Sequence, residues 1–170
     1  MTLALRPFEP RDDRELISWF PDPDDLRRFA GPSLSWPLDR AQLRAVRNAA
    51  NLVPFSAYIP PVREPACGHV ELVVLAEQGV VRLARVGLAP RVRGRGLGRE
   101  LLTLAFEESR ARGAREIELF VFEDNVPARR LYASFGFERV GVDPTDASSL
   151  RMRVALPSPR DVAAGGDRRV

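Results

Sequence analysis

The feature that most constrains this chain is the loop RGRGLG at residues 93–98, which separates two segments of different hydrophobic period. Residues 80–88 predict a strand, whereas residues 97–112 place apolar side chains on one helical stripe. The start of a helix leaves about four backbone N–H groups without partners and carries about half a positive charge. Glycines in the loop let the backbone approach a ligand closely. The pattern predicts a site for a pyrophosphate-like anion; the alternative is that the glycines serve only a tight turn.

Two common phosphate loops do not fit this stretch. A Walker loop needs Gly-Lys followed by Ser or Thr, and the chain has no lysine. The dinucleotide fingerprint needs G-x-G-x-x-G after a strand that opens a parallel unit. Here the glycines are evenly spaced, and the preceding strand belongs to a predicted hairpin. We therefore expect neither of the nucleotide folds that these loops define.

Charge and composition narrow the class of protein further. All 26 basic residues are arginine, yet the net charge is only +3. We interpret the arginine bias as genome composition and expect no nucleic-acid partner, although an arginine-rich RNA or DNA binder remains a third hypothesis. Four arginines do gather near the loop, which points to a compact polyanion: Arg91, Arg93, Arg95 and Arg99.

The cysteine and histidine counts and the hydropathy argue against a disulfide-bonded, metal-binding or membrane-spanning protein. One cysteine, Cys67, cannot form an internal disulfide, and with a single histidine, His69, we expect no metal site. Cys67 is expected to be a small buried side chain. No apolar run approaches the roughly 20 residues of a membrane helix, and the first residues lack a secretory pattern. We expect no membrane association and a cytoplasmic location.

At 170 residues the chain is expected to form one domain, residues 1–156, followed by a disordered tail at 157–170. A tight turn at 77–79 is expected to join two hairpin strands. The expected elements are a strand at 3–6, a helix at 10–20, a helical turn with a packed loop at 21–37, a helix at 38–50, strands at 53–59, 67–76 and 80–88, a helix at 97–112, a strand at 116–122, a helix from a cap at Asp124 or Asn125 to Gly136, and strands at 137–141 and 150–156.

The residues around the loop resemble the GCN5-related N-acetyltransferase (GNAT) superfamily. Its signature R/Q-x-x-G-x-G/A stands at residues 93–98, preceded by GLAP at 87–90. A second block follows about thirty residues later, with EDN at 123–125, Ala128, and LY at 131–132 leading to FGF at 135–137. The resemblance covers about residues 80–142.

The resemblance implies a fold and a cofactor site. The fold is a mixed α/β (α+β) structure with a largely antiparallel central sheet, flanked by helices on both faces and split where the coenzyme lies. Acetyl-CoA is the implied co-substrate: its pantetheine arm would follow the strand that ends at residues 86–88, and the Leu88 amide would face the thioester oxygen. Asn125 would contact the pantetheine arm, although a helix cap is its alternative role. The cofactor-binding residues implied are Val86, Leu88, Arg93, Gly94, Arg95, Gly96, Leu97, Gly98, Arg99, Asn125, Ala128 and Tyr132.

Tyr132 stands at the family position near the sulfur, which implies a general acid. A phenol with a pKa of about 10 can protonate a thiolate whose conjugate acid lies near 8.5. The alternative is an aromatic side chain that only packs beside Leu131 and Phe135.

The general base is where the sequence departs from the family pattern. Many relatives carry glutamate two residues before the GLAP glycine, and this chain has Arg85, which cannot accept a proton. His69 and Glu71, two apart on one strand, share a face and remain candidates; Glu71 would need its pKa raised by burial. A water chain could replace both, and Arg85 could instead meet an acidic acceptor.

Together these observations predict an acyl-CoA-dependent N-acetyltransferase that acts by direct attack of a primary amine in a ternary complex. The acceptor, a small molecule or a protein N-terminus, is not identified by the sequence. A non-catalytic acyl-CoA-binding or regulatory module is the alternative, and a monomer or homodimer is expected. Three aromatic residues are candidates for either the acceptor groove or the core: Trp19, Phe29 and Trp36.

Overall fold

The protein folds around one seven-stranded sheet in the computed structural model, which describes residues 2–157. The strand order is β1-β2-β3-β4-β5-β7-β6, and every neighbouring pair is antiparallel except β4 and β5. The strands are β1 (Ala4–Pro7), β2 (Leu52–Tyr58), β3 (Gly68–Leu75), β4 (Val80–Leu88), β5 (Glu116–Phe122), β6 (Glu138–Asp143) and β7 (Asp146–Ala155). The expected mixed, largely antiparallel sheet is confirmed.

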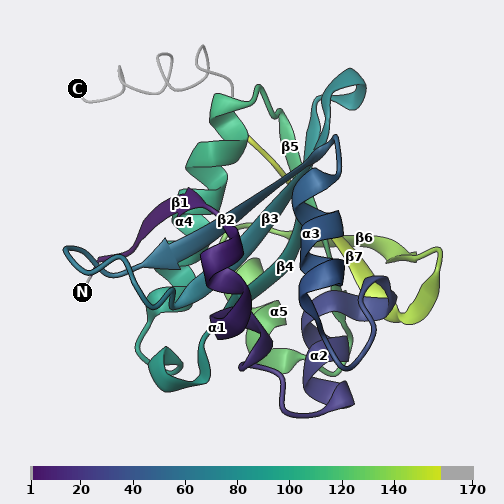
Figure 1. The fold of residues 1–170 in the computed structure, drawn as a ribbon. Coiled ribbons are helices and arrows are strands. Elements are labelled where there is room, and N and C mark those ends of the chain that lie inside the picture. Colours follow the sequence, from purple (N-terminus) through teal and green to yellow (C-terminus); the bar gives the residue numbers. More distant parts are fainter. Residues whose placement is uncertain (1, 158–170) are drawn as a thin grey trace.

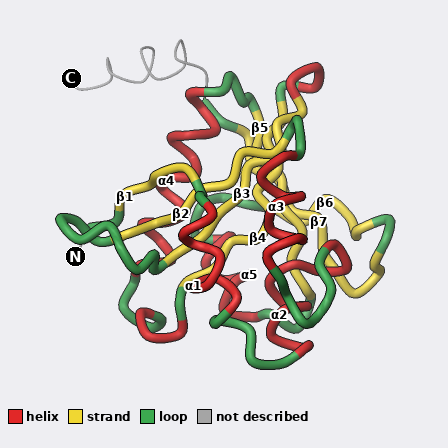
Figure 2. Tube along the Cα trace, viewed as in Figure 1, coloured by secondary structure: helices red, strands yellow, loops and turns green. Residues whose placement is uncertain are grey.

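Helices cover both faces of this sheet (Figures 1 and 2). In the view of Figure 1, α1, α2 and α3 lie in front of the strands, and α4 and α5 lie behind them. The helices are α1 (Asp13–Ile17), α2 (Pro23–Ala30), α3 (Arg40–Asn48), α4 (Leu97–Ala111) and α5 (Val126–Ala133), with short 3₁₀ turns η1 (Pro10–Asp12), η2 (Gly31–Ser33), η3 (Ala76–Gln78) and η4 (Pro90–Val92).

Two expected elements at the N-terminal end differ from the structure. The helix expected at 10–20 is instead η1 followed by α1, which ends at Ile17, before Pro21 removes the next backbone donor. The segment 21–37 holds more helix than expected. Asp22 caps α2 by accepting a hydrogen bond from the Asp25 N–H, and Pro23 occupies its first turn. This cap with a proline at the first helical position was a readable helix start.

The core lies on both sides of the sheet. The stripe on α4 packs Leu97, Leu101 and Ala105 against the strands with almost no exposure, and Ile117 and Leu119 of β5 meet it there. Cys67 is buried as expected, and so is Trp19. The expected tail at 157–170 lies outside the described residues apart from Pro157. No helix among residues 2–157 is long and apolar enough to cross a bilayer.

The sheet opens between β4 and β5. These two strands pair only from Val80–Glu116 to Leu83–Leu119. Beyond that point β4 is paired on its β3 side alone, and its register with β3 shifts between His69 and Glu71. The shift is a β-bulge, and Arg85 within it adopts φ +46°, a conformation uncommon outside glycine. The bulge therefore turns β4 away from β5 and leaves one of its edges open.

Candidate active site

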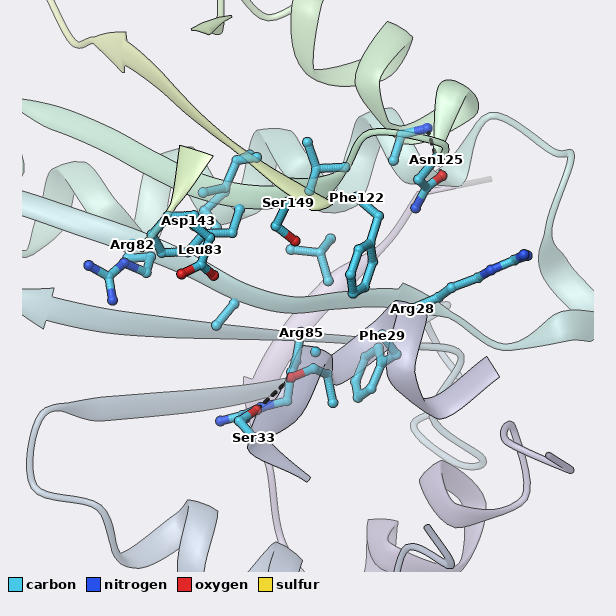
Figure 3. Close-up of a pocket in the computed structure, with 18 of the residues that line it drawn as sticks. Arg28, Phe29, Ser33, Arg82, Leu83, Arg85, Phe122, Asn125, Asp143 and Ser149 are labelled. Carbon is cyan, nitrogen blue, oxygen red and sulfur yellow. Dashed lines mark hydrogen bonds between the residues drawn. The ribbon is translucent and has the colours of Figure 1, made fainter. Parts of the chain in front are cut away.

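A cavity of about 510 Å³ occupies the space where β4 and β5 separate. Residues from α2 and η2 form one wall, β4 and β5 form the floor, and α5 with the turn between β6 and β7 form the rest (Figure 3). Arg27 joins two of these walls: its Nη2 atom lies 3.5 Å from the Oδ2 atom of Asp146, and its guanidinium lies over the Phe122 ring. The volume is within the range of about 300–1,000 Å³ typical of small-molecule sites.

The Arg- and Gly-rich loop has the backbone expected of an anion site. Gly94 and Gly96 adopt φ +73° and +79°, and a Cβ atom at either position would meet no other heavy atom within 4 Å. The space next to both residues is thus open to a ligand. Gly96 is the N-cap of α4, a helix of 15 residues, so the orphan N–H groups of its first turn lie at this point. The loop residues fit a coenzyme pyrophosphate.

Gly98 serves another purpose than the other two glycines. A Cβ atom at Gly98 would lie 3.3 Å from the Cδ2 atom of Leu131. The missing side chain therefore allows α4 and α5 to approach each other. The loop residues 93–99 do not line the cavity itself, so the expected cofactor site divides between the loop and the cavity.

Three of the four arginines in the expected cluster make hydrogen bonds or ion pairs within the protein. Arg93 donates from Nε to the carbonyl of Leu88 over 3.0 Å. Arg99 donates to Ser134 Oγ over 2.9 Å and lies over the Phe135 ring. Arg91 pairs with Glu15 and donates to the carbonyl of Ala66. Arg95 is exposed and has no side-chain partner among residues 2–157, so it is the member of this cluster best placed to meet an anion.

Four of the expected coenzyme contacts line the cavity: Val86, Asn125, Ala128 and Tyr132. Asn125 caps α5, because its Oδ1 atom accepts a hydrogen bond from the Ala128 N–H at 3.3 Å. Asn125 therefore has the helix-capping role that was the alternative to a coenzyme contact. Its amide nitrogen still reaches toward the cavity, so capping does not prevent a second contact.

The Leu88 amide points to the open edge of β4. Leu88 lies opposite Gly68 in the register with β3, and the next residue, Ala89, donates its N–H to the carbonyl of Cys67. Hydrogen-bonded and non-hydrogen-bonded pairs alternate along an antiparallel ladder, so the backbone groups of Leu88 face away from β3. The bond from Arg93 to the Leu88 carbonyl agrees with this direction.

Tyr132 lines the same cavity from α5, and its ring packs edge-on against Phe137. Burial raises the pKa of its phenol to about 12. This value corrects the solution value of about 10 expected from the sequence, and it keeps the phenol protonated at any physiological pH. The hydroxyl makes no hydrogen bond with the described residues, so a proton is available for a ligand.

The sequence comparisons agree with this geometry. A family model for the Acetyltransferase (GNAT) family matches residues 12–137. The chain belongs to the GNAT acetyltransferase family. The resemblance found in the sequence is thereby confirmed.

Individual relatives differ in extent and acceptor. Mycothiol acetyltransferase of Thermomonospora curvata is 47% identical over 58 residues, or 34% of this chain and 20% of that protein. Its namesake in Actinosynnema mirum is 29% identical over 154 residues, or 83% of this chain and 46% of that protein. The chain thus spans from about a fifth to about half the length of these curated relatives. Spermidine N-acetyltransferase from Vibrio cholerae, solved with CoA and spermine, shares the fold with a TM-score of 0.75 at 20% identity, over 91% of this chain and 95% of that chain.

The GNAT position that often carries a glutamate holds Arg85, and its side chain lines the cavity. The two expected base candidates lie behind it. The Nε2 atom of His69 lies 2.9 Å from Oε1 of Glu71, and Oε2 of Glu71 accepts from the Nε atom of Arg85 over 2.7 Å. Both candidates are about 1% exposed, and neither lines the cavity.

The pKa of Glu71 shifts in the direction opposite to the one that a general base would need. Burial alone would raise it, but the hydrogen bonds and charges of His69 and Arg85 outweigh burial, so the pKa lies below its ordinary value of 4.5. The rise in pKa that Glu71 would need to act as a base is therefore absent, because the carboxylate has two partners for its charged form. His69 is enclosed by aromatic rings, with the Phe8 centroid at 4.8 Å and the Phe29 centroid at 5.9 Å. The pair is therefore built to hold Arg85.

One carboxylate of this GNAT site was not found from the sequence. Asp143, at the end of β6, lines the cavity, and its Oδ1 atom accepts hydrogen bonds from the N–H and Oγ1 of Thr145. The sequence around it shows an Asx-turn, DPT, but nothing that assigns the turn to a cavity. The three aromatic candidates have different places. Phe29 lines the cavity, and Trp19 belongs to the core. Trp36 is 48% exposed and belongs to neither the cavity wall nor the core.

Proposed function

We propose that this chain is an N-acetyltransferase that transfers an acetyl group from acetyl-CoA to a primary amine in a ternary complex. The observation that carries the proposal is the opening between β4 and β5, where Tyr132 lines the same cavity as the unpaired part of β4. The anion-binding start of α4 lies beyond the end of that edge. The proposal includes the cytoplasmic location and the monomer or homodimer expected from the sequence.

The residues that would hold acetyl-CoA form two groups, one for the pyrophosphate and one for the pantetheine arm. The backbone N–H groups of residues 93–99 suit the pyrophosphate, since Gly94 and Gly96 leave open space and α4 supplies its positive end. Val86, Asn125 and Ala128 suit the pantetheine arm. Bound acetyl-CoA supplies the acetyl group as a thioester.

Leu88 and Tyr132 would stabilise the two atoms that gain negative charge in the reaction, the thioester oxygen and the departing sulfur. The Leu88 N–H is fixed and points to the open edge, so it can donate to the thioester oxygen without reorganisation. Tyr132 can donate its proton to the departing sulfur. The phenol has a pKa of about 12 and a free thiol has a pKa near 8.5. This difference of about 3.5 makes the proton transfer unfavourable by about 5 kcal/mol. The donation therefore requires that the same buried cavity also raises the pKa of the thiol.

The amine's proton needs an acceptor at the cavity. His69 and Glu71 do not reach it, whereas Asp143 does. We assign Asp143 to accept that proton, directly or through one water. In the balanced reaction the nitrogen–carbon bond forms, the carbon–sulfur bond breaks, one proton leaves the amine for Asp143, and one passes from Tyr132 to sulfur.

The test measures binding and turnover separately. Calorimetry of the purified chain with CoA and acetyl-CoA reports whether the coenzyme binds, and release of free thiol over a panel of amines reports transfer. We expect binding together with amine-dependent thiol release. A non-catalytic acyl-CoA-binding module would bind and release no thiol, and the absence of coenzyme binding would contradict both hypotheses.

A further inference from the structure

Arg85, on β4, is held in place by side chains of two other elements, β3 and η2. Its Nε donates to Oε2 of Glu71 at 2.7 Å, and its Nη2 lies 2.5 Å from the same oxygen. Its Nη1 donates to the Oγ of Ser33, on η2, at 2.7 Å. His69 holds the other oxygen of Glu71. The guanidinium therefore has one orientation before any acceptor binds, which removes the ordering cost that a flexible side chain would incur.

These contacts do not use all the donors of Arg85. A guanidinium carries five N–H groups. Glu71 takes those on one edge, and Ser33 takes one more, so each Nη atom keeps a donor. Glu71 is almost fully buried behind the guanidinium, while Arg85 itself lines the cavity (Figure 3). A ligand in the cavity thus meets N–H donors first and a carboxylate only beyond them.

The rest of the cavity wall is also rich in arginine. Arg28 and Arg82 line it together with Arg85, and Asp143 is the only carboxylate among the lining residues. Arg28 makes no ion pair within the described part of the chain. Arg82 shares the buried carboxylate of Glu118 with two further guanidinium groups, from Arg151 and Arg153, which leaves positive charge in excess around that carboxylate.

We infer that the acceptor is a small amine that also carries a carboxylate, and that Arg85 binds this carboxylate. The inference rests on the proposed N-acetyltransferase function and names its substrate class. A guanidinium with free N–H donors on both Nη atoms matches the two oxygens of a carboxylate. Asp143, at the end of β6, would meet the amino group, so a molecule with both charges satisfies both residues.

The same charges disfavour a polyamine. A chain of ammonium groups would place positive charge beside Arg82 and Arg85, and like charges in a partly desolvated cavity repel strongly. The size of the cavity limits the acceptor as well, because about 510 Å³ must hold the reacting end of the coenzyme and the acceptor together. A compact amino acid fits these limits.

The experiment compares matched acceptors that differ only in the carboxylate. For several amino acids, the acid, its amide and the decarboxylated amine are assayed for kcat/KM with acetyl-CoA, with spermidine as a polycation. Calorimetry with the CoA-bound protein measures acceptor affinity independently of turnover. We expect the acids to exceed their amides and decarboxylated forms by about ten- to a hundredfold, the range for a hydrogen bond to a charged group.

Variants connect the preference to Arg85. Arg85→Gln should raise KM for the acids much more than KM for the amides, so the preference disappears. Because this change removes the guanidinium that pairs with the buried Glu71, the double variant Glu71→Gln/Arg85→Gln, which removes both charges, is tested beside it. Arg44→Gln on α3 removes an exposed arginine outside the cavity and should leave the preference intact.

The outcomes separate this inference from the proposed function. Coenzyme binding and thiol release with amides, decarboxylated amines, spermidine or peptide N-termini at least as fast as with acids would overturn the inference and leave the transferase standing. Coenzyme binding without affinity for any amino acid would also overturn it. A preference for acids that survives in the folded double variant would show that Arg85 does not bind the carboxylate. Loss of coenzyme binding contradicts the proposed function itself.

Discussion

The carboxylate of Glu71 lies behind the guanidinium of Arg85, with Arg85 Nε and Glu71 Oε2 separated by 2.7 Å. An acidic side chain is therefore present next to the GNAT position that here holds arginine, but on the neighbouring strand and out of reach of the cavity. Its negative charge serves to orient a cation. Where many relatives have a proton acceptor on β4, this protein thus has Arg85, a hydrogen-bond donor suited to an anion.

Removing Glu71 should destabilise the protein strongly. In Glu71→Ala the Arg85 guanidinium and the buried His69 ring lose their shared partner, and breaking a buried ion pair in this way costs about 3–5 kcal/mol. Urea unfolding measures the free energy. Glu107→Ala, at an exposed glutamate of α4, serves as the matched control and should change it by less than about 0.5 kcal/mol. Equal effects of the two substitutions would show that the buried pair contributes nothing.

The same carboxylate should make stability depend on pH. The pKa of Glu71 is lowered in the folded protein from its ordinary 4.5, so its contribution is present above pH 4.5 and is lost as pH falls through the folded pKa. In Glu71→Gln, the free energy of unfolding should therefore fall less between pH 5 and lower pH than in the unsubstituted protein. Parallel curves for the two proteins would contradict the lowered pKa.

Tyr132→Phe should lower kcat about a hundredfold or more, because it removes the proposed proton donor. The fold and the affinity for acetyl-CoA should change little, since the hydroxyl has no hydrogen bond with the described residues and the ring remains. Steady-state kinetics and calorimetry measure these effects. The other tyrosine of the chain provides the control: Tyr58→Phe, on β2, should leave kcat unchanged.

The pH profile offers a separate check on Tyr132. With a pKa of about 12, the phenol stays protonated up to about pH 11, so its ionisation should cause no fall in kcat below that pH. An alkaline limb near pH 9 that is absent from Tyr132→Phe would mean that the phenol ionises far more easily than its burial implies.

Gly96→Ala should weaken coenzyme binding without a steric clash. The residue sits at φ +79°, where a side chain costs about 1–2 kcal/mol, although no atom lies within 4 Å of the added Cβ. Relaxing this strain displaces the N–H groups at the start of α4, so the calorimetric Kd for CoA should rise about tenfold. Gly141→Ala, with open space and no positive φ, is the matched control. An unchanged Kd in Gly96→Ala would argue against the loop as the pyrophosphate site.

Gly87→Ala should affect the acceptor wall. The new Cβ atom would lie 3.0 Å from both Cδ2 and Cε2 of Phe29, so the ring and α2 must shift. We expect a higher KM for the acceptor and a smaller change in the Kd for CoA. The double variant Gly87→Ala/Phe29→Leu should recover part of the acceptor KM, because it removes ring atoms at the point of contact. No recovery would indicate that the effect of Gly87 arises elsewhere.

Much of the fold, and the loop and helix starts of the candidate site, could be predicted from local patterns. Alternation in β5, the helical stripe of α4 and the cap of α5 are properties of short segments, and the structure reproduces them within a few residues. The anion loop is local as well, since it needs only glycines and a helix start. The extent of α1 and α2 was missed where prolines changed the helix boundaries.

The sequence by itself determined the order of the elements, the glycine-rich loop before α4 and the helix that carries Tyr132, because each depends on residues close together in the chain. Only the tertiary structure decided which charged groups face the cavity. The bulge at Arg85 rotates that side chain into the cavity and leaves Glu71 behind it, and the sheet order brings Asp143 to the same cavity. Strand register and sheet order arise from contacts between distant segments, so the partner of a buried charge cannot be read from its neighbours in sequence.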